Sequence, residues 1–231
     1  CPNKLETKLK KSKKKPDVLV VVHFAGLPCE MKSINYLSKK YNFKIIEDAS
    51  HAIGSDFMGF PTGSSHFSDI TVFSFHPVKI ITTGEGGAAL TNSSLLSKKL
   101  DLISNQGIER NQTLFKNKKM KNCSWYYEMQ SLGYNYRMND ILSALGMSQL
   151  NQIKKFIKKR EYIFNYYKTN LDTKYLKLQH ISSNVRSSYH LAVTTYKNKI
   201  SKKLVFKKFL NNGIKLQTHY IPIHLHPYFK K

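Results

Sequence analysis

A strand–helix–strand pattern near the start of the chain constrains the fold more than any other feature. Residues 17–24, DVLVVVHF, form a continuous β-branched run that predicts a strand covered on both faces. Residues 30–41 place apolar side chains at helical spacing, and residues 43–47 form the next strand. Two such strands joined through a helix pair in parallel by a right-handed crossover. The sequence therefore predicts an α/β fold around a mostly parallel sheet.

Polar side chains follow the ends of two predicted strands. Asp48 and His51 come just after the strand that ends at Glu47, whereas Ser74 and Lys79 lie at the end of a strand predicted for residues 71–75. Ligands of open α/β sheets bind at the carboxyl ends of strands, so we expect these side chains to meet. A lysine that forms a Schiff base and a carboxylate that keeps a pyridine nitrogen protonated are what pyridoxal phosphate requires.

Lys79 has apolar neighbours on both sides, namely Val78, Ile80 and Ile81. Burial among them would lower the pKa of its ammonium group and make the amine a usable nucleophile. The alternative is a lysine whose ammonium reaches solvent from a buried hairpin, which is the usual state of an isolated lysine. A glycine-rich turn at residues 82–87 follows, and a second strand is predicted for residues 88–91. The presence of Asp48 and His51 favours the reactive lysine.

The chain is strongly basic, with 38 Lys and Arg against 14 Asp and Glu and a net charge of +24. Such a charge is compatible with a nucleic-acid or membrane-surface partner. Nucleic-acid readers rely on arginine, however, and only four basic residues are arginines: Arg110, Arg137, Arg160 and Arg186. We therefore favour an exposed lysine-rich surface without a nucleic-acid partner, and a polyanion-binding module with steep salt dependence is the less favoured alternative.

Cysteine and histidine spacing argues against disulfides and metal sites. Cys1, Cys29 and Cys123 form neither a disulfide framework nor a zinc motif, which fits a cytoplasmic protein. The histidines at 219, 224 and 226 have no acidic or cysteine partner nearby, so no metal is expected. No apolar run approaches the ~20 residues of a membrane span.

The remaining segments predict two domains, a partial large cofactor-binding domain at residues 1–160 and a partial small α+β domain at residues 161–231. The large domain begins with an exposed lysine-rich segment. The expected elements are the exposed lead-in 3–15, a loop 56–68, a helix 94–104, an irregular excursion 106–125, a helix 140–151 capped by Asn139, a lysine-rich helix 153–171, a strand 189–196, a helix 202–211 ended by Gly213, and a strand 214–220.

Several motifs occur in a recognisable order: IEDASHAIGS, FSFHPVK, TTGEGGA, GYNYRMNDILSALGMSQL and HYIPIHLHPYF. From about Asp17 to the last residue, the chain resembles the DegT/DnrJ/EryC1/StrS family of sugar-nucleotide aminotransferases, and within it the enzymes of pseudaminic acid biosynthesis. The resemblance implies fold type I, pyridoxal phosphate and a cytoplasmic homodimer with shared active sites. It also implies transfer of an amino group, expected to come from L-glutamate, to the C4 keto group of a UDP-linked 4-keto-6-deoxy sugar for surface glycans.

The resemblance also implies roles for the residues at the strand ends. Lys79 would form the Schiff base and then move a proton as a free amine, and Asp48 would pair with the pyridine nitrogen. His51 would lie near the ring and its phenolic oxygen, and Ser74 would bind the phosphate. In isolation, Asp48 and Ser74 are common strand-end turn formers. His76 has no derived role beyond capping the loop.

Other motif positions would act in the neighbouring subunit or on the substrate. Asn135 would reach the cofactor phosphate across the subunit interface, and Arg137 would reach the substrate there. The alternative is that both residues form a helix-entry loop. Glu85, His219 and Tyr220 would lie on the substrate side, with a purely structural turn as the alternative for Glu85.

The chain also departs from the family pattern. Nothing before Asp17 matches the family's amino-terminal part, which supplies a Gly-Thr/Ser phosphate loop and an aromatic that stacks on the cofactor ring. The small domain stops soon after Tyr228. We therefore expect an internal fragment that by itself binds the cofactor weakly, aggregates and does not catalyse. The alternative function is that of a truncated, non-catalytic product. A dehydrating branch of the family lacks the lysine, so Lys79 argues against that activity.

Overall fold

The computed structural model describes residues 1–196 and 200–229. The chain forms two compact units, one of Cys1–Leu171 with Leu178–Thr194 and one of Asp172–Lys177 with Thr195–Lys231. The predicted domain boundary at residue 160 lies inside one continuous helix, α5 (Ile153–Asn170). The assignment of the units to a large and a small domain stays a prediction.

A four-stranded sheet forms the centre of the first unit. Its order is β1-β2-β5-β6. The strands are β1 (Val18–Val22), β2 (Lys44–Asp48), β5 (Ile70–Ser74) and β6 (Gly87–Leu90). β1, β2 and β5 are parallel neighbours, and β6 pairs with β5 in the antiparallel sense. The predicted α/β class is confirmed, and the sheet is mixed but mostly parallel.

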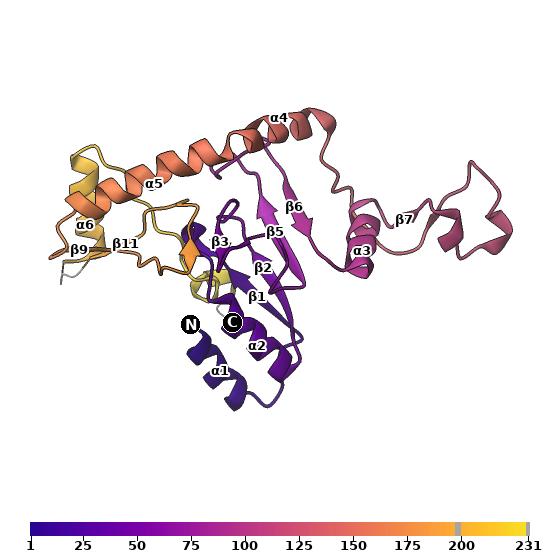
Figure 1. Cartoon of the computed structure of the whole chain (residues 1–231), viewed down its shortest axis with the longest axis horizontal. Coiled ribbons are helices and arrows are strands. Elements are labelled where there is room, and N and C mark those ends of the chain that lie inside the picture. Colours follow the sequence, from indigo (N-terminus) through magenta and orange to yellow (C-terminus); the bar gives the residue numbers. More distant parts are fainter. Residues whose placement is uncertain (197–199, 230–231) are drawn as a thin grey trace. The chain divides into compact units, whose positions relative to one another are not determined.

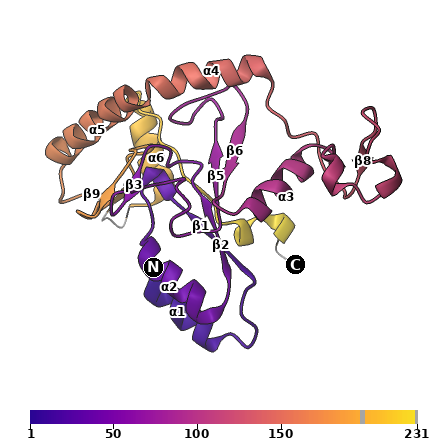
Figure 2. The same cartoon turned by 45° about the vertical axis from the view of Figure 1, so that its right-hand side comes forward.

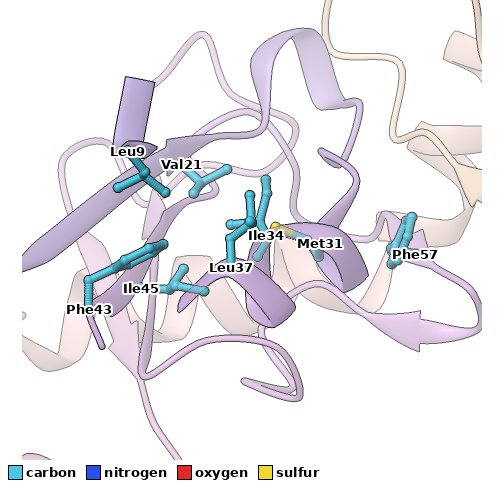
Figure 3. Close-up of a cluster of buried hydrophobic side chains, with 8 residues drawn as sticks. All are labelled: Leu9, Val21, Met31, Ile34, Leu37, Phe43, Ile45 and Phe57. Atoms are coloured by element: carbon cyan, nitrogen blue, oxygen red, sulfur yellow. The ribbon is translucent and has the colours of Figure 1, made fainter. Parts of the chain in front are cut away.

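Helix α2 (Met31–Tyr41) connects β1 to β2 and provides the main core. The Glu30 side chain caps it by accepting the Ser33 N–H at 2.9 Å, and Asn42 ends it in the left-handed conformation. Its buried face and the sheet meet in one cluster (Figure 3). The cluster consists of Leu9, Val21, Met31, Ile34, Leu37, Phe43, Ile45 and Phe57. The predicted parallel pairing of the two strands through a helix is confirmed.

The lysine-rich start of the chain is a helix, which the sequence pattern did not indicate, and most of its residues are exposed as predicted. α1 (Pro2–Lys11) lies beside α2 in both views (Figures 1 and 2). Leu9 is buried in the core and Leu5, one turn earlier, packs against it. Glu6 accepts a hydrogen bond from Lys40 of α2 at 2.8 Å. The two leucines form a narrow apolar stripe that the surrounding lysines obscure in the sequence.

The expectation that β1 is covered on both faces is wrong for the described residues. Val21 is buried, but Val18 and Val22 are exposed and Val20 is 58% exposed. β1 is also the edge strand of this sheet. A continuous β-branched run indicates a strand, but it does not reveal whether a second layer covers the outer face.

The remaining elements of the first unit are shorter. Two of them, β3 and β4, lie in the segment expected to be a loop, and they pair with β10 in a three-stranded sheet of order β10-β3-β4. The predicted bounds of the helices at 94–104 and 140–151 are confirmed. The elements are β3 (Asp56–Phe57), β4 (Phe60–Pro61), α3 (Ser94–Ser104), β7 (Ile108–Glu109), β8 (Glu128–Met129), α4 (Asp140–Asn151) and β10 (Val185–Arg186), with short 3₁₀ turns at Phe24–Gly26, Gln112–Leu114 and Lys118–Met120.

The second unit is small. β9 (Leu176–Leu178) pairs with β11 (Thr194–Tyr196), and α6 (Lys202–Asn211) is followed by the predicted Gly213, whose φ is positive. Short 3₁₀ turns cover Ile223–Leu225 and Pro227–Phe229. The predicted strand 189–196 is reduced to β11, and the predicted strand 214–220 is not a strand. Alternating aliphatic residues form a strand only where a partner strand accepts their backbone hydrogen bonds.

Within residues 1–196 and 200–229, no helix combines the length and apolarity needed to cross a bilayer.

A buried charged cluster links β2, β5 and the residue that follows β1. Nε2 of His23 donates to Oε2 of Glu47 at 2.6 Å, and the hydroxyls of Ser68 and Thr71 donate to Oε1. Burial lowers the pKa of His23. The Cys29 side chain and the Glu47 carboxylate raise this pKa by more than burial lowers it, and the result is a pKa of about 9. Burial raises the pKa of Glu47, and its hydrogen bonds from His23 and Ser68 bring it below the ordinary value. The Cys29 N–H lies 3.2 Å from Nδ1 of His23 and would lose this contact on protonation, which limits the rise.

We expect this cluster to make the protein less stable in alkaline solution. The raised pKa of His23 contributes stability that is complete below its ordinary value of 6.5 and is lost as the pH rises through about 9. The loss should be on the order of 3 kcal/mol, at ~1.4 kcal/mol per pH unit. Urea unfolding between pH 6 and pH 10 measures it. The Glu47→Gln variant should show a flatter pH dependence, and an equal fall in this variant would contradict the assignment to this pair.

Candidate active site

Two parallel strands bring their polar ends to one edge of the sheet. Asp48 ends β2 and is paired with Val72 of β5, and the Ala49 N–H donates to Val72 O at 2.8 Å. Ser74 ends β5 on the same side. Because β2 and β5 run in the same direction, these two strand ends lie at the same edge of the sheet.

Lys79 lies in the turn that connects β5 to β6. Its N–H donates to His76 O at 2.9 Å, and Phe75 O accepts both the Thr83 N–H at 3.0 Å and the Thr82 hydroxyl at 2.9 Å. Ile80 and Ile81 are buried directly after it. The turn is thus anchored on the carboxyl side of Lys79, which is itself only partly buried.

The surroundings of Lys79 change its ionisation. Burial lowers the pKa of its ammonium group below the ordinary value, and the Asp48 carboxylate acts in the opposite direction. Lys79 and Asp48 are therefore near enough to interact electrostatically. A lowered pKa increases the fraction of neutral amine, which is the nucleophilic form.

Short local hydrogen bonds orient the two strand-end side chains. Oδ1 of Asp48 accepts both the N–H of Ser50 at 3.1 Å and its hydroxyl at 2.6 Å. Oγ of Ser74 accepts the His76 N–H at 3.4 Å. Sequence reasoning missed Ser50, although an Asp followed two residues later by Ser is a common side-chain-to-backbone turn.

His51 is buried beside the same strand end. Its Nδ1 accepts the Ala25 N–H at 3.3 Å, and its ring centroid lies 4.3 Å from that of His190. In the neutral imidazole, an acceptor at Nδ1 leaves the proton on Nε2. The structure therefore assigns His51 a defined tautomer.

A segment far along the chain packs against this strand end and was missed in the sequence. Ser187, Ser188 and His190 are buried in the first unit, where both serine hydroxyls reach Gly26 O. Residues 189 and 190 had been placed in a small-domain strand. Buried serines resemble surface serines in the sequence, because only the folded chain brings their acceptors to them.

The glycine-rich turn after Lys79 is tightly packed against the start of α4. A side chain at Gly86 would lie 2.5 Å from Oγ1 of Thr83 and 2.6 Å from Cε of Met138. One at Gly146 of α4 would lie 2.8 Å from Cγ2 of Thr83. These glycines permit the close approach, and Thr83 and Met138 are packing residues that the motif alone did not reveal.

The other predicted site residues have different surroundings. Asn135 forms an isolated antiparallel β-bridge with Asn105, the residue after α3. Nη1 of Arg137 donates to Oδ1 of Asn105 at 2.5 Å. Glu85 is exposed in the Lys79 turn, with Oε1 3.9 Å from Nε2 of His76. His219 and Tyr220 belong to the second unit, where their ring centroids are 4.7 Å apart. The cofactor and substrate roles of these residues stay predictions.

The residues at the sheet edge suit an aldehyde that carries a basic ring nitrogen better than a metal ion. They supply an amine of lowered pKa, a carboxylate that interacts with it and an imidazole whose Nδ1 accepts a backbone N–H. In the described part of the chain, no group of three His, Cys, Asp or Glu side chains is arranged to hold a metal. This set of donors fits pyridoxal phosphate.

Comparison with known proteins extends the resemblance over the whole chain. The model of the DegT/DnrJ/EryC1/StrS aminotransferase family matches residues 1–231, so the similarity does not begin only at Asp17. The chain is 37% identical over 231 residues to the UDP-4-amino-4,6-dideoxy-N-acetyl-beta-L-altrosamine transaminase of Campylobacter jejuni strain 81-176, covering 99% of this chain and 58% of that protein.

Solved structures show the same similarity. PseC of Helicobacter pylori, an aminotransferase involved in the biosynthesis of pseudoaminic acid, aligns with a TM-score of 0.84 at 34% identity over 96% of this chain and 57% of that one. The putative sugar aminotransferase Spr1654 of Streptococcus pneumoniae, in its PMP form, aligns with a TM-score of 0.83 at 26% identity over 97% and 61%. The chain therefore spans somewhat more than half the length of the relatives that it matches.

Proposed function

Since the chain belongs to the DegT/DnrJ/EryC1/StrS aminotransferase family, we propose that it carries the cofactor-attaching part of a sugar-nucleotide aminotransferase. The family and the structural relatives are dependent on pyridoxal phosphate. The observation that carries the proposal is the position of Lys79 in the turn after β5, at the sheet edge where Asp48 ends β2. Burial lowers its pKa, and the Asp48 carboxylate acts on it.

Pyridoxal phosphate, when bound, supplies an electron sink for a carbanion at the α-carbon of the amino donor. In the proposal, Nζ of Lys79 would hold the cofactor and would carry a proton as a general base and acid. The Asp48 carboxylate is held by Ser50, and it would pair with the pyridine nitrogen. The Ser74 hydroxyl would bind the phosphate, and His51 would lie near the cofactor ring.

The proposal also names a substrate and an amino donor. We propose a UDP-linked 4-keto-6-deoxy sugar that is aminated at C4 with L-glutamate as donor, for nonulosonic acid biosynthesis in the cytoplasm. The printed function of the Campylobacter jejuni relative supports this class of substrate. Glu85, Arg137, His219 and Tyr220 are the side chains proposed to contact the sugar nucleotide.

A homodimer is also part of the proposal, because α4 leaves apolar side chains in solvent. Ile141 is 81% exposed, and Leu145, Met147 and Leu150 of the same helix are exposed as well. Contiguous exposed apolar surface marks interaction sites, and a second copy of the chain is the commonest partner. Asn135, just before α4, would then reach the partner's cofactor phosphate. Sedimentation of the chimaera described in the next paragraph should give twice the mass of one polypeptide. A monomer at all concentrations would contradict the sharing of active sites between two subunits.

The activity is best tested in a chimaera that joins this chain to the part of the Campylobacter jejuni relative outside the match. This protein should convert a UDP-linked 4-keto-6-deoxy sugar and L-glutamate into an amino sugar, detected by mass spectrometry. A GDP-linked 4-keto sugar provides the comparison for nucleotide preference. Failure of both sugars with a folded, cofactor-loaded chimaera would reject the proposed substrate class. The 231-residue chain by itself is the second comparison, and we expect weak cofactor binding and no transfer from it.

A further inference from the structure

We infer that Ser188 is a positioning residue for His51, and this inference rests on the proposed function of the site. Ser188 is fully buried, and its Oγ donates to His51 O at 3.1 Å. Its backbone N–H donates to Gly26 O at 2.9 Å. One residue, 137 positions after His51 in the sequence, thus holds the main chain at His51 and at the neighbouring turn.

The turn at Ala25 and Gly26 also donates a backbone hydrogen bond to the His51 ring. The Ala25 N–H donates to Nδ1 of His51 at 3.3 Å, and Ala25 O accepts the Leu191 N–H at 3.3 Å. Ala25 is fully buried with φ of 62°, a left-handed conformation that is unfavourable for alanine. Strained residues persist where the surrounding structure holds them, and here residues 188–191 provide the restraint.

Gly26 shows how closely the three segments approach. A Cβ at this position would lie 2.6 Å from Oγ of Ser188, 2.9 Å from the backbone nitrogen of His190 and 3.1 Å from the backbone oxygen of His51. Gly26 also has φ of 87°, which favours glycine. The restraint on His51 is therefore a packed junction without space for a side chain larger than hydrogen at its centre.

The junction determines both the direction and the tautomer of the His51 ring. A proton on Nδ1 would face the Ala25 N–H and break that hydrogen bond, so the neutral ring carries its proton on Nε2. The His190 ring packs against it at 4.3 Å and 38°, which restricts rotation. Arg160 donates to His190 O at 3.1 Å and so holds the His190 backbone. Removal of the Ser188 hydroxyl, which donates to His51 O, should loosen the main chain at His51 and so mix the two tautomers.

Ser187 provides a matched control. It is also fully buried, its Oγ donates to Gly26 O at 2.9 Å, and it accepts the Tyr189 N–H at 3.0 Å. It bonds the same carbonyl as Ser188, whereas the bond to His51 O comes from Ser188. A comparison of Ser188→Ala with Ser187→Ala therefore separates a loss of His51 positioning from a general loss of buried hydrogen bonds.

The test uses the chimaera with ¹⁵N-labelled histidine. In the cofactor-free protein, His51, assigned by a His51→Gln variant, should show the Nε2–H tautomer. Ser188→Ala should give a mixture of tautomers and weaken pyridoxal phosphate binding about tenfold, the effect of ~1.4 kcal/mol. Ser188→Cys keeps a weak donor, so it should restore part of the Nε2–H tautomer and part of the pyridoxal phosphate affinity. Thermal unfolding reports whether each variant folds.

A His51 tautomer unchanged in folded Ser188→Ala would overturn the inference, as would an equal change in Ser187→Ala. If Ser188→Ala does not fold, the Ser188→Cys spectrum decides by the same criterion. Failure of the proposed function is seen separately, since it would appear as absent cofactor binding in the unmutated chimaera while the tautomer measurement remains possible.

Discussion

Replacing Lys79 with alanine is expected to abolish both covalent cofactor attachment and amino transfer in the chimaera. Burial lowers the pKa of this lysine, and it follows a strand whose end adjoins that of Asp48. Alanine has no amine to attach the aldehyde or to carry the proton, so no activity above background should remain. Ile80 and Ile81 should keep the turn folded, because the backbone bonds of the turn do not involve the lysine side chain.

The measurement is borohydride reduction of the loaded protein followed by mass spectrometry of its peptides. The unmutated chimaera should carry the reduced cofactor on the peptide that contains Lys79. Lys44→Ala is a suitable control, because Lys44 begins β2 at the opposite end from Asp48 and forms an exposed ion pair with Asp69. Such pairs contribute ~0–1 kcal/mol, so this variant should remain active. Trapping of the cofactor on another lysine in unmutated protein would show that the assignment is wrong.

Asp48→Asn should leave the cofactor attached but reduce turnover by roughly three powers of ten, a large effect of the kind seen when preorganised electrostatic stabilisation is lost. The amide has the shape of the carboxylate and keeps an oxygen for the Ser50 N–H, so the change removes mainly the negative charge. Without that charge, protonation of the pyridine nitrogen is less favourable and the electron sink is weaker. Near-normal turnover would contradict the proposed pairing.

A second readout of Asp48→Asn concerns Lys79. The Asp48 carboxylate raises the pKa of Lys79 against the lowering effect of burial. Its removal should therefore lower the pKa of Lys79 further, and the cofactor-free protein should react with an amine-directed reagent at lower pH. Asp101→Asn, on the exposed side of α3, is the control and should leave both turnover and this pH profile unchanged. A rise in the pKa of Lys79 would contradict the electrostatic coupling.

Local patterns in the sequence were sufficient for several elements. Asn139 was predicted to cap a helix at 140, and its side chain accepts the Leu142 N–H at 2.9 Å. Gly213 was predicted to end α6 and has φ of 75°. These signals act over a few residues, because a cap or a left-handed turn depends on the residue itself and its nearest neighbours.

Other elements depend on contacts between distant parts of the chain. Leu5 and Leu9 form a helix that is stable against α2, but the lysines around them predicted an exposed segment. Residues 214–220 alternate like a strand, yet the described structure provides no partner for them in a sheet. Tertiary packing adds the apolar surface or the hydrogen-bond partner that an isolated segment lacks.

The sequence by itself determined the chemistry at the sheet edge, namely a lysine, a carboxylate, an imidazole and a hydroxyl placed after parallel strands. Alternating strands and helices dictate where strand ends lie, and short spacing then places Asp48, His51, Ser74 and Lys79. Only the tertiary structure decided what holds His51. Ser188 reaches it from 137 residues away, and the left-handed Ala25 is restrained by the same segment. Long-range hydrogen bonds to backbone carbonyls leave no pattern in the sequence, because any residue supplies the acceptor and the fold alone selects which one is near.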